Sequence, residues 1–146
     1  MKWLYFGFLI LFTVVVQANE VESLNAKQLE QQVQVINELQ NVILMKDSKV
    51  ADVDALFAHF TDNFEYIHEV YGGTYTKEHL YNNYVKFLKA GRYQNTSPRY
   101  KITNMIVGHD AVSVEREQVY EGQIEKHLTV FEFKHNKVAK IIEYWK

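Results

Sequence analysis

Several polar side chains occupy positions from which a β-strand would direct them toward its apolar face: Tyr66, His68, Arg116, His127 and Glu143. A histidine inside an apolar cavity, oriented by a carboxylate, can act as a general base near neutral pH. Arginine and tyrosine side chains can stabilise a carboxylate or an enolate on a ligand. These residue types predict acid–base chemistry with His68 as the base and Glu143 as its orienting partner. The predicted electrophilic groups are Tyr66 and Arg116.

Large apolar and aromatic side chains are expected to surround this cluster and to form a cavity for a small, largely apolar molecule. The predicted ligand-binding residues are Phe57, Phe64, Tyr84, His127, Phe131 and Trp145. Many tyrosines also crowd one segment of the chain, and a mouth lined by tyrosine suits a flat or ring-bearing ligand. These tyrosines are Tyr71, Tyr75, Tyr81, Tyr84 and Tyr93.

The same cluster has simpler interpretations. A buried arginine beside a glutamate is often a structural ion pair, and an interior histidine usually only hydrogen-bonds a neighbour. The cavity could also bind a molecule without transforming it. Catalysis, binding without chemistry and a purely structural role therefore all stay open.

A metal site built from His68, His127 and Glu143 would have the composition of a two-histidine, one-carboxylate centre. These residues come from separate predicted strands, without the short ligand spacing that makes such a prediction reliable. The sequence contains no cysteine, which excludes thiolate catalysis, disulfides and cysteine-ligated metals. We therefore predict no metal site and no cofactor.

The elements that must position the cluster are predicted strands, in which side chains alternate between two faces. Residues 64–70 alternate in this way, with Tyr66 and His68 on the inner face. The later strands form an antiparallel meander separated by short polar turns, at residues 99–107, 111–121, 124–134 and 138–145. Their parity places each polar residue beside apolar neighbours: Arg116 with Val114, His127 with Phe131, and Glu143 with Ile141 and Trp145.

Helices are predicted before and after the first strand. Apolar residues at helical spacing mark residues 24–45 and 50–60. Thr76 is a credible N-cap for a third helix, which ends before Gly91. A chain with long helices near its start and hairpins at its end is typical of an α+β protein, with helices on one face of an antiparallel sheet.

Residues 1–18 have the features of a signal peptide. Lys2 supplies the positive charge, residues 3–16 are almost wholly apolar, and Val16-Gln17-Ala18 fits the small-x-small cleavage pattern. The apolar run is shorter than the roughly 20 residues that cross a bilayer. We expect cleavage before Asn19, a periplasmic or secreted location, and no membrane attachment of the mature chain.

Residues 19–146 are predicted to form a single domain, since a chain of this length normally builds one core. Removing Lys2 leaves 15 basic and 18 acidic residues, a formal charge of −3. A mildly acidic chain without a basic patch is not typical of nucleic-acid-binding proteins. We therefore expect no nucleic-acid partner.

The order helix, helix, strand, turn, helix and four-stranded meander resembles the nuclear transport factor 2-like superfamily, including its SnoaL-like and ketosteroid-isomerase-like branches. The segment FTDNFEYIH at 60–68 is similar to the superfamily's helix-to-strand junction. GHDAVSV at 108–114 is similar to its central hairpin, and FEFKHNKV at 131–138 with EYW at 143–145 to its terminal one. The resemblance covers residues 30–146 and implies a cone-shaped, curved antiparallel sheet, or barrel, wrapped on the N-terminal helices.

Members of that superfamily use their apolar cavity for isomerisation, cyclisation, dehydration, epoxide opening or no chemistry, so the fold does not fix the function. The inner face of residues 64–70 also lacks the acids of the isomerase-like branch. The resemblance implies a SnoaL-like protein that binds a small molecule, and leaves an isomerase, dehydratase or cyclase, a non-catalytic binding protein and an interaction module as alternatives. It also implies a homodimer, for which the outer-face residues Ile67, Leu128 and Val130 offer a contact.

Overall fold

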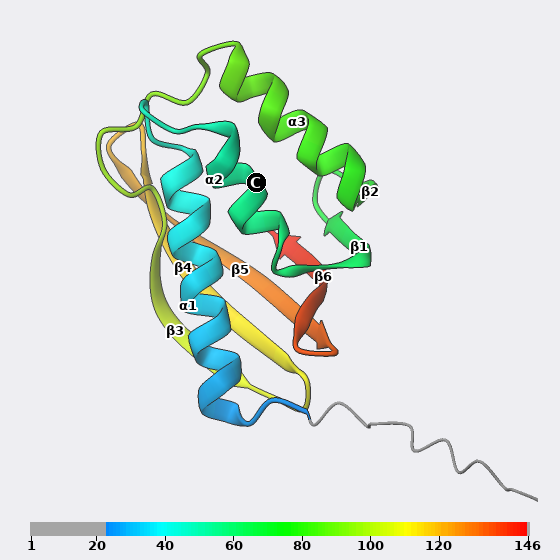
Figure 1. Ribbon diagram of the computed structural model, residues 1–146. Coiled ribbons are helices and arrows are strands. Elements are labelled where there is room, and N and C mark those ends of the chain that lie inside the picture. Colours follow the sequence, from blue (N-terminus) through cyan, green and yellow to red (C-terminus); the bar gives the residue numbers. More distant parts are fainter. Residues whose placement is uncertain (1–22, 146) are drawn as a thin grey trace, which may run out of the picture.

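The computed structural model describes residues 23–145, which fold as helices laid on one face of a curved sheet (Figure 1). The predicted signal peptide at 1–18 lies outside the described residues. The helices are α1 (Ala26–Ile43), α2 (Val50–Phe57) and α3 (Lys77–Lys89). The strands are β1 (Phe60–His68), β2 (Thr74–Thr76), β3 (Lys101–Val107), β4 (Ala111–Tyr120), β5 (Gln123–Lys134) and β6 (Lys137–Tyr144). None of the helices within 23–145 is long and apolar enough to cross a membrane.

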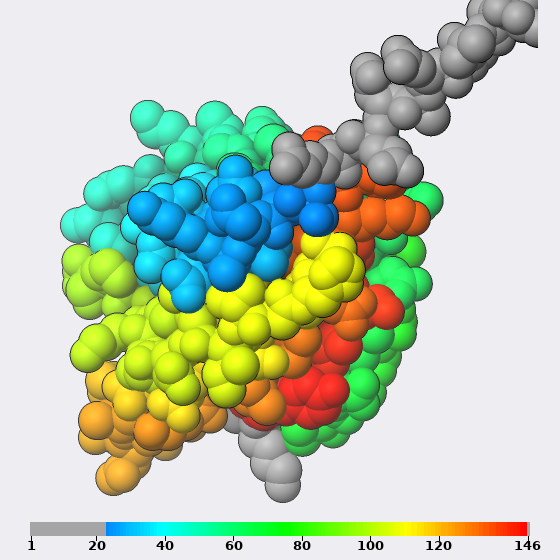
Figure 2. All heavy atoms as spheres, turned by 90° about the horizontal axis from the view of Figure 1, so that it is seen from below, coloured from blue at the N-terminus to red at the C-terminus, as the bar shows by residue number. Residues whose placement is uncertain are grey.

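Helix α1 begins where its sequence supplies a cap and buries one apolar stripe. The Asn25 side chain accepts a hydrogen bond from the Gln28 backbone N–H, and the Gln28 side chain accepts one from the Asn25 N–H. This reciprocal pair satisfies donors that have no partner inside the helix. Seen from below (Figure 2), the first turns of α1 lie against the β3–β4 hairpin. The stripe facing the sheet includes Leu29, Val33, Ile36 and Ile43.

The sheet is an open, six-stranded surface with the order β2-β1-β6-β5-β4-β3. Strands β3 to β6 form the predicted antiparallel meander. The β5–β6 turn consists of His135 and Asn136, both with positive φ, as a two-residue hairpin turn requires. The predicted α+β fold class, with helices on one face of the sheet, is confirmed.

One strand pairing departs from a purely antiparallel sheet. Strand β1 runs parallel to β6, with Tyr66 opposite Ile141 and His68 opposite Glu143. The short strand β2, which the sequence pattern does not predict, pairs antiparallel with the other side of β1. The sheet is therefore mixed, and it stays open because its outermost strands are β2 and β3. Alternation of side chains reveals faces but not strand direction, which explains the difference.

The second helix is shorter than predicted. Helix α2 ends at Phe57, and Phe60 begins β1 instead of continuing the helix. The Phe60 ring stacks on Phe64 with centroids 4.3 Å apart. Short apolar runs fit both helical and strand spacing, so the pattern alone misplaced this boundary. The predicted third helix is confirmed, because the Thr76 hydroxyl oxygen accepts a hydrogen bond from the His79 N–H.

Asn41 ties α1 to the segment that enters β3. Its Oδ1 accepts hydrogen bonds from the backbone N–H groups of Arg99 (2.9 Å) and Tyr100 (2.8 Å), and its Nδ2 donates to the Tyr100 carbonyl at 2.9 Å. Asn41 itself is 8% exposed. These bonds fix the backbone of Tyr100, whose side chain lines a pocket.

Replacing Asn41 with alanine is expected to lower the free energy of unfolding by about 1–3 kcal/mol, because it leaves partly buried backbone groups unpaired. Urea denaturation followed by circular dichroism measures this change. Val42→Ala is the matched control, since Val42 is 43% exposed and surface changes usually stay within about 0.5 kcal/mol. Equal losses in the two variants would contradict the role assigned to Asn41.

Candidate functional site

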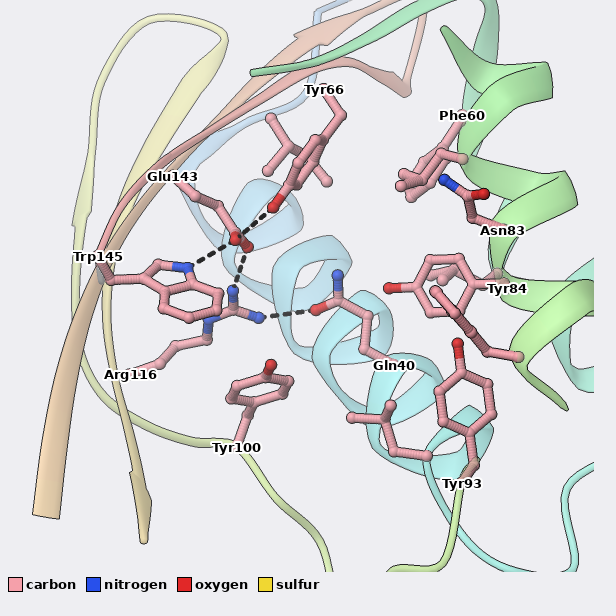
Figure 3. Close-up of a pocket in the computed structure, with 15 residues that line it drawn as sticks. Gln40, Phe60, Tyr66, Asn83, Tyr84, Tyr93, Tyr100, Arg116, Glu143 and Trp145 are labelled. Carbon is pink, nitrogen blue, oxygen red and sulfur yellow. Dashed lines mark hydrogen bonds and ion pairs between the residues drawn. The ribbon is translucent and has the colours of Figure 1, made fainter. Parts of the chain in front are cut away.

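A pocket of about 270 Å³ opens between the helices and the inner face of the sheet (Figure 3). Its walls are mostly aromatic and aliphatic, and every layer of the fold contributes to them. The lining residues are Gln40 of α1, Leu44 just after it, Leu56 of α2, Phe60 and Tyr66 of β1, Leu80, Asn83, Tyr84 and Phe87 of α3, Tyr93 and Tyr100 after α3, Arg116 of β4, Ile141 and Glu143 of β6, and Trp145.

A buried ion pair between Arg116 and Glu143 forms one side of the pocket. An Nη2 hydrogen of Arg116 donates to Oε1 of Glu143 at 2.8 Å, and the two residues are 1% and 5% exposed. Nη2 also donates to Thr129 Oγ1 at 3.0 Å, while Nη1 donates to Gln40 Oε1 at 2.7 Å. The guanidinium lies over the Tyr100 ring, 4.7 Å from its centroid. These contacts neutralise and orient the arginine.

The second carboxylate oxygen of Glu143 is also occupied. The Tyr66 hydroxyl donates to Oε2 at 2.7 Å, and the Trp145 indole N–H donates to the same atom at 2.6 Å. Figure 3 shows these donors converging with Arg116 on the carboxylate. Glu143 therefore holds the pocket wall together through these hydrogen bonds, and this arrangement is structural rather than that of a general base.

His68 takes no part in this network. Its Nδ1 accepts a hydrogen bond from the Tyr71 backbone N–H at 3.3 Å, and its ring packs edge-on to Trp145 with centroids 5.0 Å apart. Its Nε2 is buried without a partner among residues 23–145. The predicted orienting bond from Glu143 is absent among these residues, because Glu143 turns to Tyr66, Arg116 and Trp145. His68 and Glu143 are neighbours in the β1–β6 register, but this did not bring their side chains into a hydrogen bond.

His127 lies behind Trp145 and does not line the pocket. The two rings stack with centroids 4.2 Å apart and an interplanar angle of 3°. Burial, followed by the nearby charge of Arg116, lowers the pKa of His127 from its ordinary value of 6.5. The neutral ring is thus the form that the folded protein favours.

This shift predicts how stability depends on pH. The unfolded chain binds a proton at His127 as the pH falls below about 6.5, whereas the folded chain binds it only at lower pH, so stability decreases over that interval. His127→Phe keeps a ring against Trp145, and its melting temperature should fall less than that of the wild type between about pH 7 and pH 5. His109→Phe, at an exposed turn, should behave like the wild type. Parallel curves for all three proteins would contradict the prediction.

The remaining predicted binding residues divide into two groups. Tyr84 and Trp145 line the pocket. Phe57, Phe64 and Phe131 are instead buried in the core, at 4%, 2% and 0% exposure, and do not line it. Phe64 and Phe131 are inward-facing, as strand parity predicts, and Phe57 lies on the apolar stripe of α2, but none of the three lines the pocket.

Several pocket residues were missed at the level of sequence. Gln40 lies four residues after Ile36 and three before Ile43, so it falls on the apolar stripe of α1, and that spacing could have revealed it. Asn83 and Phe87 lie on the inward stripe of α3 in the same way, three and seven residues after Leu80, whereas Tyr100 gave no comparable signal of a site. Tyr100 lies just before β3 in an irregular segment, where no period indicates which way a side chain points.

The pocket tyrosines are hydrogen-bond donors at neutral pH. Burial raises the pKa of Tyr93 to about 12 and also raises the pKa values of Tyr66, Tyr84 and Tyr100. Their phenol groups therefore stay protonated. Among residues 23–145, no group of three histidine, aspartate or glutamate side chains is arranged to hold a metal ion.

The chain matches no protein-family model and no curated protein. Solved structures nevertheless share its fold. A nuclear transport factor 2-like protein of unknown function from Pseudomonas aeruginosa is 16% identical, with a TM-score of 0.62 covering 82% of this chain and 98% of that one. A nuclear transport factor 2-like protein from Anabaena variabilis is 13% identical, with a TM-score of 0.57 covering 86% and 94%.

A de novo designed protein with a curved β-sheet is similar to the same extent. It is 12% identical, with a TM-score of 0.60 covering 84% of this chain and 88% of that one. The likenesses show that the chain has the nuclear transport factor 2-like fold that its sequence resembles. Because a designed protein shares this fold, the function must be argued from the pocket.

Proposed function

We propose that this chain, which has the nuclear transport factor 2-like fold, binds a small, largely apolar, ring-bearing molecule in the pocket of Figure 3. The observation that carries the proposal is the pocket itself, a cavity of about 270 Å³ with aromatic walls beside the hydrogen-bonded Arg116–Glu143 ion pair. Small-molecule sites typically combine apolar walls with a few placed polar groups.

Binding without chemistry is the function that the geometry supports best. A general base must have a free lone pair within reach of the proton that it abstracts. Glu143 is the one carboxylate that lines the pocket, and three of its about four acceptor positions are filled by Tyr66, Arg116 and Trp145, the remaining one being on the oxygen that pairs with Arg116. The pocket is thus better suited to hold a molecule than to deprotonate it.

Export and dimerisation form part of the proposal. The signal peptide predicted at 1–18 would direct the protein to the periplasm or outside the cell. The outer face of the sheet carries the exposed side chain of Leu128, at 46%, which would suit a contact between two copies. The ligand would then be a molecule that the protein meets outside the cytoplasm.

Native mass spectrometry of protein purified from the periplasm tests these proposals together. The spectrum is expected to show a chain beginning at Asn19, a dimer and a retained small molecule. The sequence contains two tryptophans, Trp3 and Trp145, so Trp145 becomes the only one after cleavage. Its fluorescence then reports ligand binding in the pocket directly. A clean apo mass, together with no response of Trp145 to any aromatic probe, would contradict ligand binding.

Acid–base catalysis is the second candidate function, and the unpartnered Nε2 of His68 favours it. Because Nδ1 accepts from the Tyr71 N–H, the hydrogen of an uncharged imidazole lies on Nε2, which could donate it to a ligand oxygen as a general acid. If His68 is such an acid, its hydrogen bond to the carbonyl oxygen of a ring ketone such as 2-tetralone would stabilise the enolate, and the wild type should speed the exchange of the ketone's α-protons with deuterated water. His68→Ala should lose this effect, by about 100-fold or more. Nuclear magnetic resonance measures the exchange, and equal rates in both proteins would exclude His68 as the acid.

A further inference from the structure

We propose that the pocket selects an uncharged ring bearing a hydroxyl group, a phenol or a ring alcohol, over carboxylates and amines of the same shape. This inference rests on the proposed function, because it specifies the ligand class of the same pocket. It follows from two properties of the lining, namely the absence of net charge and the supply of unpaired neutral hydrogen-bonding groups.

The charges of the pocket cancel within the protein. Arg116 and Glu143 are the only residues among its lining that carry a formal charge, and they pair at 2.8 Å. Both Nη2 hydrogens of Arg116 have protein acceptors, Thr129 and Glu143, and Nη1 donates to Gln40. The arginine therefore has no free pair of adjacent N–H groups that could bind a ligand carboxylate in a bidentate way. A charged ligand would lose its hydration without gaining a counter-ion, which is costly in a partly closed site.

Neutral hydroxyl groups, in contrast, remain unpaired. The hydroxyls of Tyr84, Tyr93 and Tyr100 make no hydrogen bond with residues 23–145, and in Figure 3 they point into the pocket. A tyrosine hydroxyl both donates and accepts, so it can pair with a ligand hydroxyl in either sense. A hydrocarbon of the same shape would leave these groups without a partner.

Glu143 adds an acceptor for a ligand O–H. A carboxylate has about four lone-pair sites, and the described residues fill three of those on Glu143. Its Oε1 receives one donor, from Arg116, whereas Oε2 receives two, from Tyr66 and Trp145. One acceptor position on Oε1 is left for a ligand donor. A phenol could donate there and accept from a pocket tyrosine, whereas a carboxylate ligand would be repelled.

A series of probes with one ring and one variable group tests the inference: para-ethylphenol, ethylbenzene, para-ethylbenzoate and para-ethylbenzylamine. Isothermal titration calorimetry with the chain beginning at Asn19 measures their affinities. The phenol is expected to bind about tenfold more tightly than ethylbenzene, since hydrogen bonds of this kind contribute about a factor of five to ten each. It should exceed the benzoate and the ammonium probe by at least the same factor.

Single Tyr→Phe variants identify the groups responsible. Tyr84→Phe, Tyr93→Phe and Tyr100→Phe keep the ring and remove an unpaired hydroxyl, so the fold should be preserved. At least one of them should reduce the preference for phenol over ethylbenzene by about fivefold while leaving ethylbenzene binding unchanged. Tyr81→Phe is the matched control, because the Tyr81 hydroxyl donates to Asp54 and Tyr81 does not line this pocket.

The outcomes separate the inference from the function on which it rests. A preference for phenol that a pocket Tyr→Phe variant weakens supports both. Binding of ethylbenzene, the benzoate or the amine as tightly as the phenol overturns the selectivity and leaves the pocket as a binding site. Binding of none of the four probes overturns the pocket function, and the selectivity with it.

Discussion

Replacing Arg116 with methionine is expected to lower the free energy of unfolding by about 3–5 kcal/mol, because it leaves the carboxylate of Glu143 buried without its counter-ion. Arg116 is 1% exposed and Glu143 is 5% exposed, so both charges depend mainly on protein partners rather than on bulk water. Thr129 and Gln40 would lose a charged donor as well. Urea denaturation, followed by circular dichroism, measures the loss.

Two further variants test the explanation. The double variant Arg116→Met, Glu143→Gln removes both charges and should recover part of the stability lost in Arg116→Met. Lys126→Met is the control for an exposed ion pair, since the Lys126 and Glu115 side chains are 62% and 41% exposed. Its effect should be about 0–1 kcal/mol. If the double variant were as unstable as Arg116→Met, the unpaired charge would not be the cause.

Replacing Asn83 with tryptophan is expected to abolish ligand binding, with a loss of affinity of about 100-fold or more, equivalent to about 2.7 kcal/mol. Asn83 lies on α3 and its side chain faces the pocket (Figure 3). An indole at this position would occupy much of a cavity of about 270 Å³ and exclude a ring-bearing ligand. Titration with para-ethylphenol measures the change.

The neighbouring residue provides the control for this substitution. Asn82 is exposed and does not line the pocket, so Asn82→Trp adds the same indole to the same helix outside the site. It should bind para-ethylphenol as tightly as the wild type. Similar affinities for Asn82→Trp and Asn83→Trp would show that the ligand does not occupy this pocket.

The faces of the strands were predictable from sequence because side chains alternate strictly along a strand. Arg116, His127 and Glu143 were predicted to point inward, and all three are buried. Inward and outward side chains alternate along β6 as predicted, even though its pairing with β5 shifts register between Glu132 and Phe133. The same argument could not separate residues that line the pocket from those beneath it, as Phe64 and Phe131 show.

The three helices, the meander of hairpins and the inward set of polar residues were predictable from the chain alone, because spacing and turn chemistry are local properties. Three features became visible only in the folded chain: β1 runs parallel to β6, Gln40 meets Arg116, and Glu143 binds Tyr66, Arg116 and Trp145 rather than His68. These contacts join residues far apart in the chain. Which of these contacts form depends on strand order and on competition among donors for one carboxylate. A local sequence pattern contains no information on either.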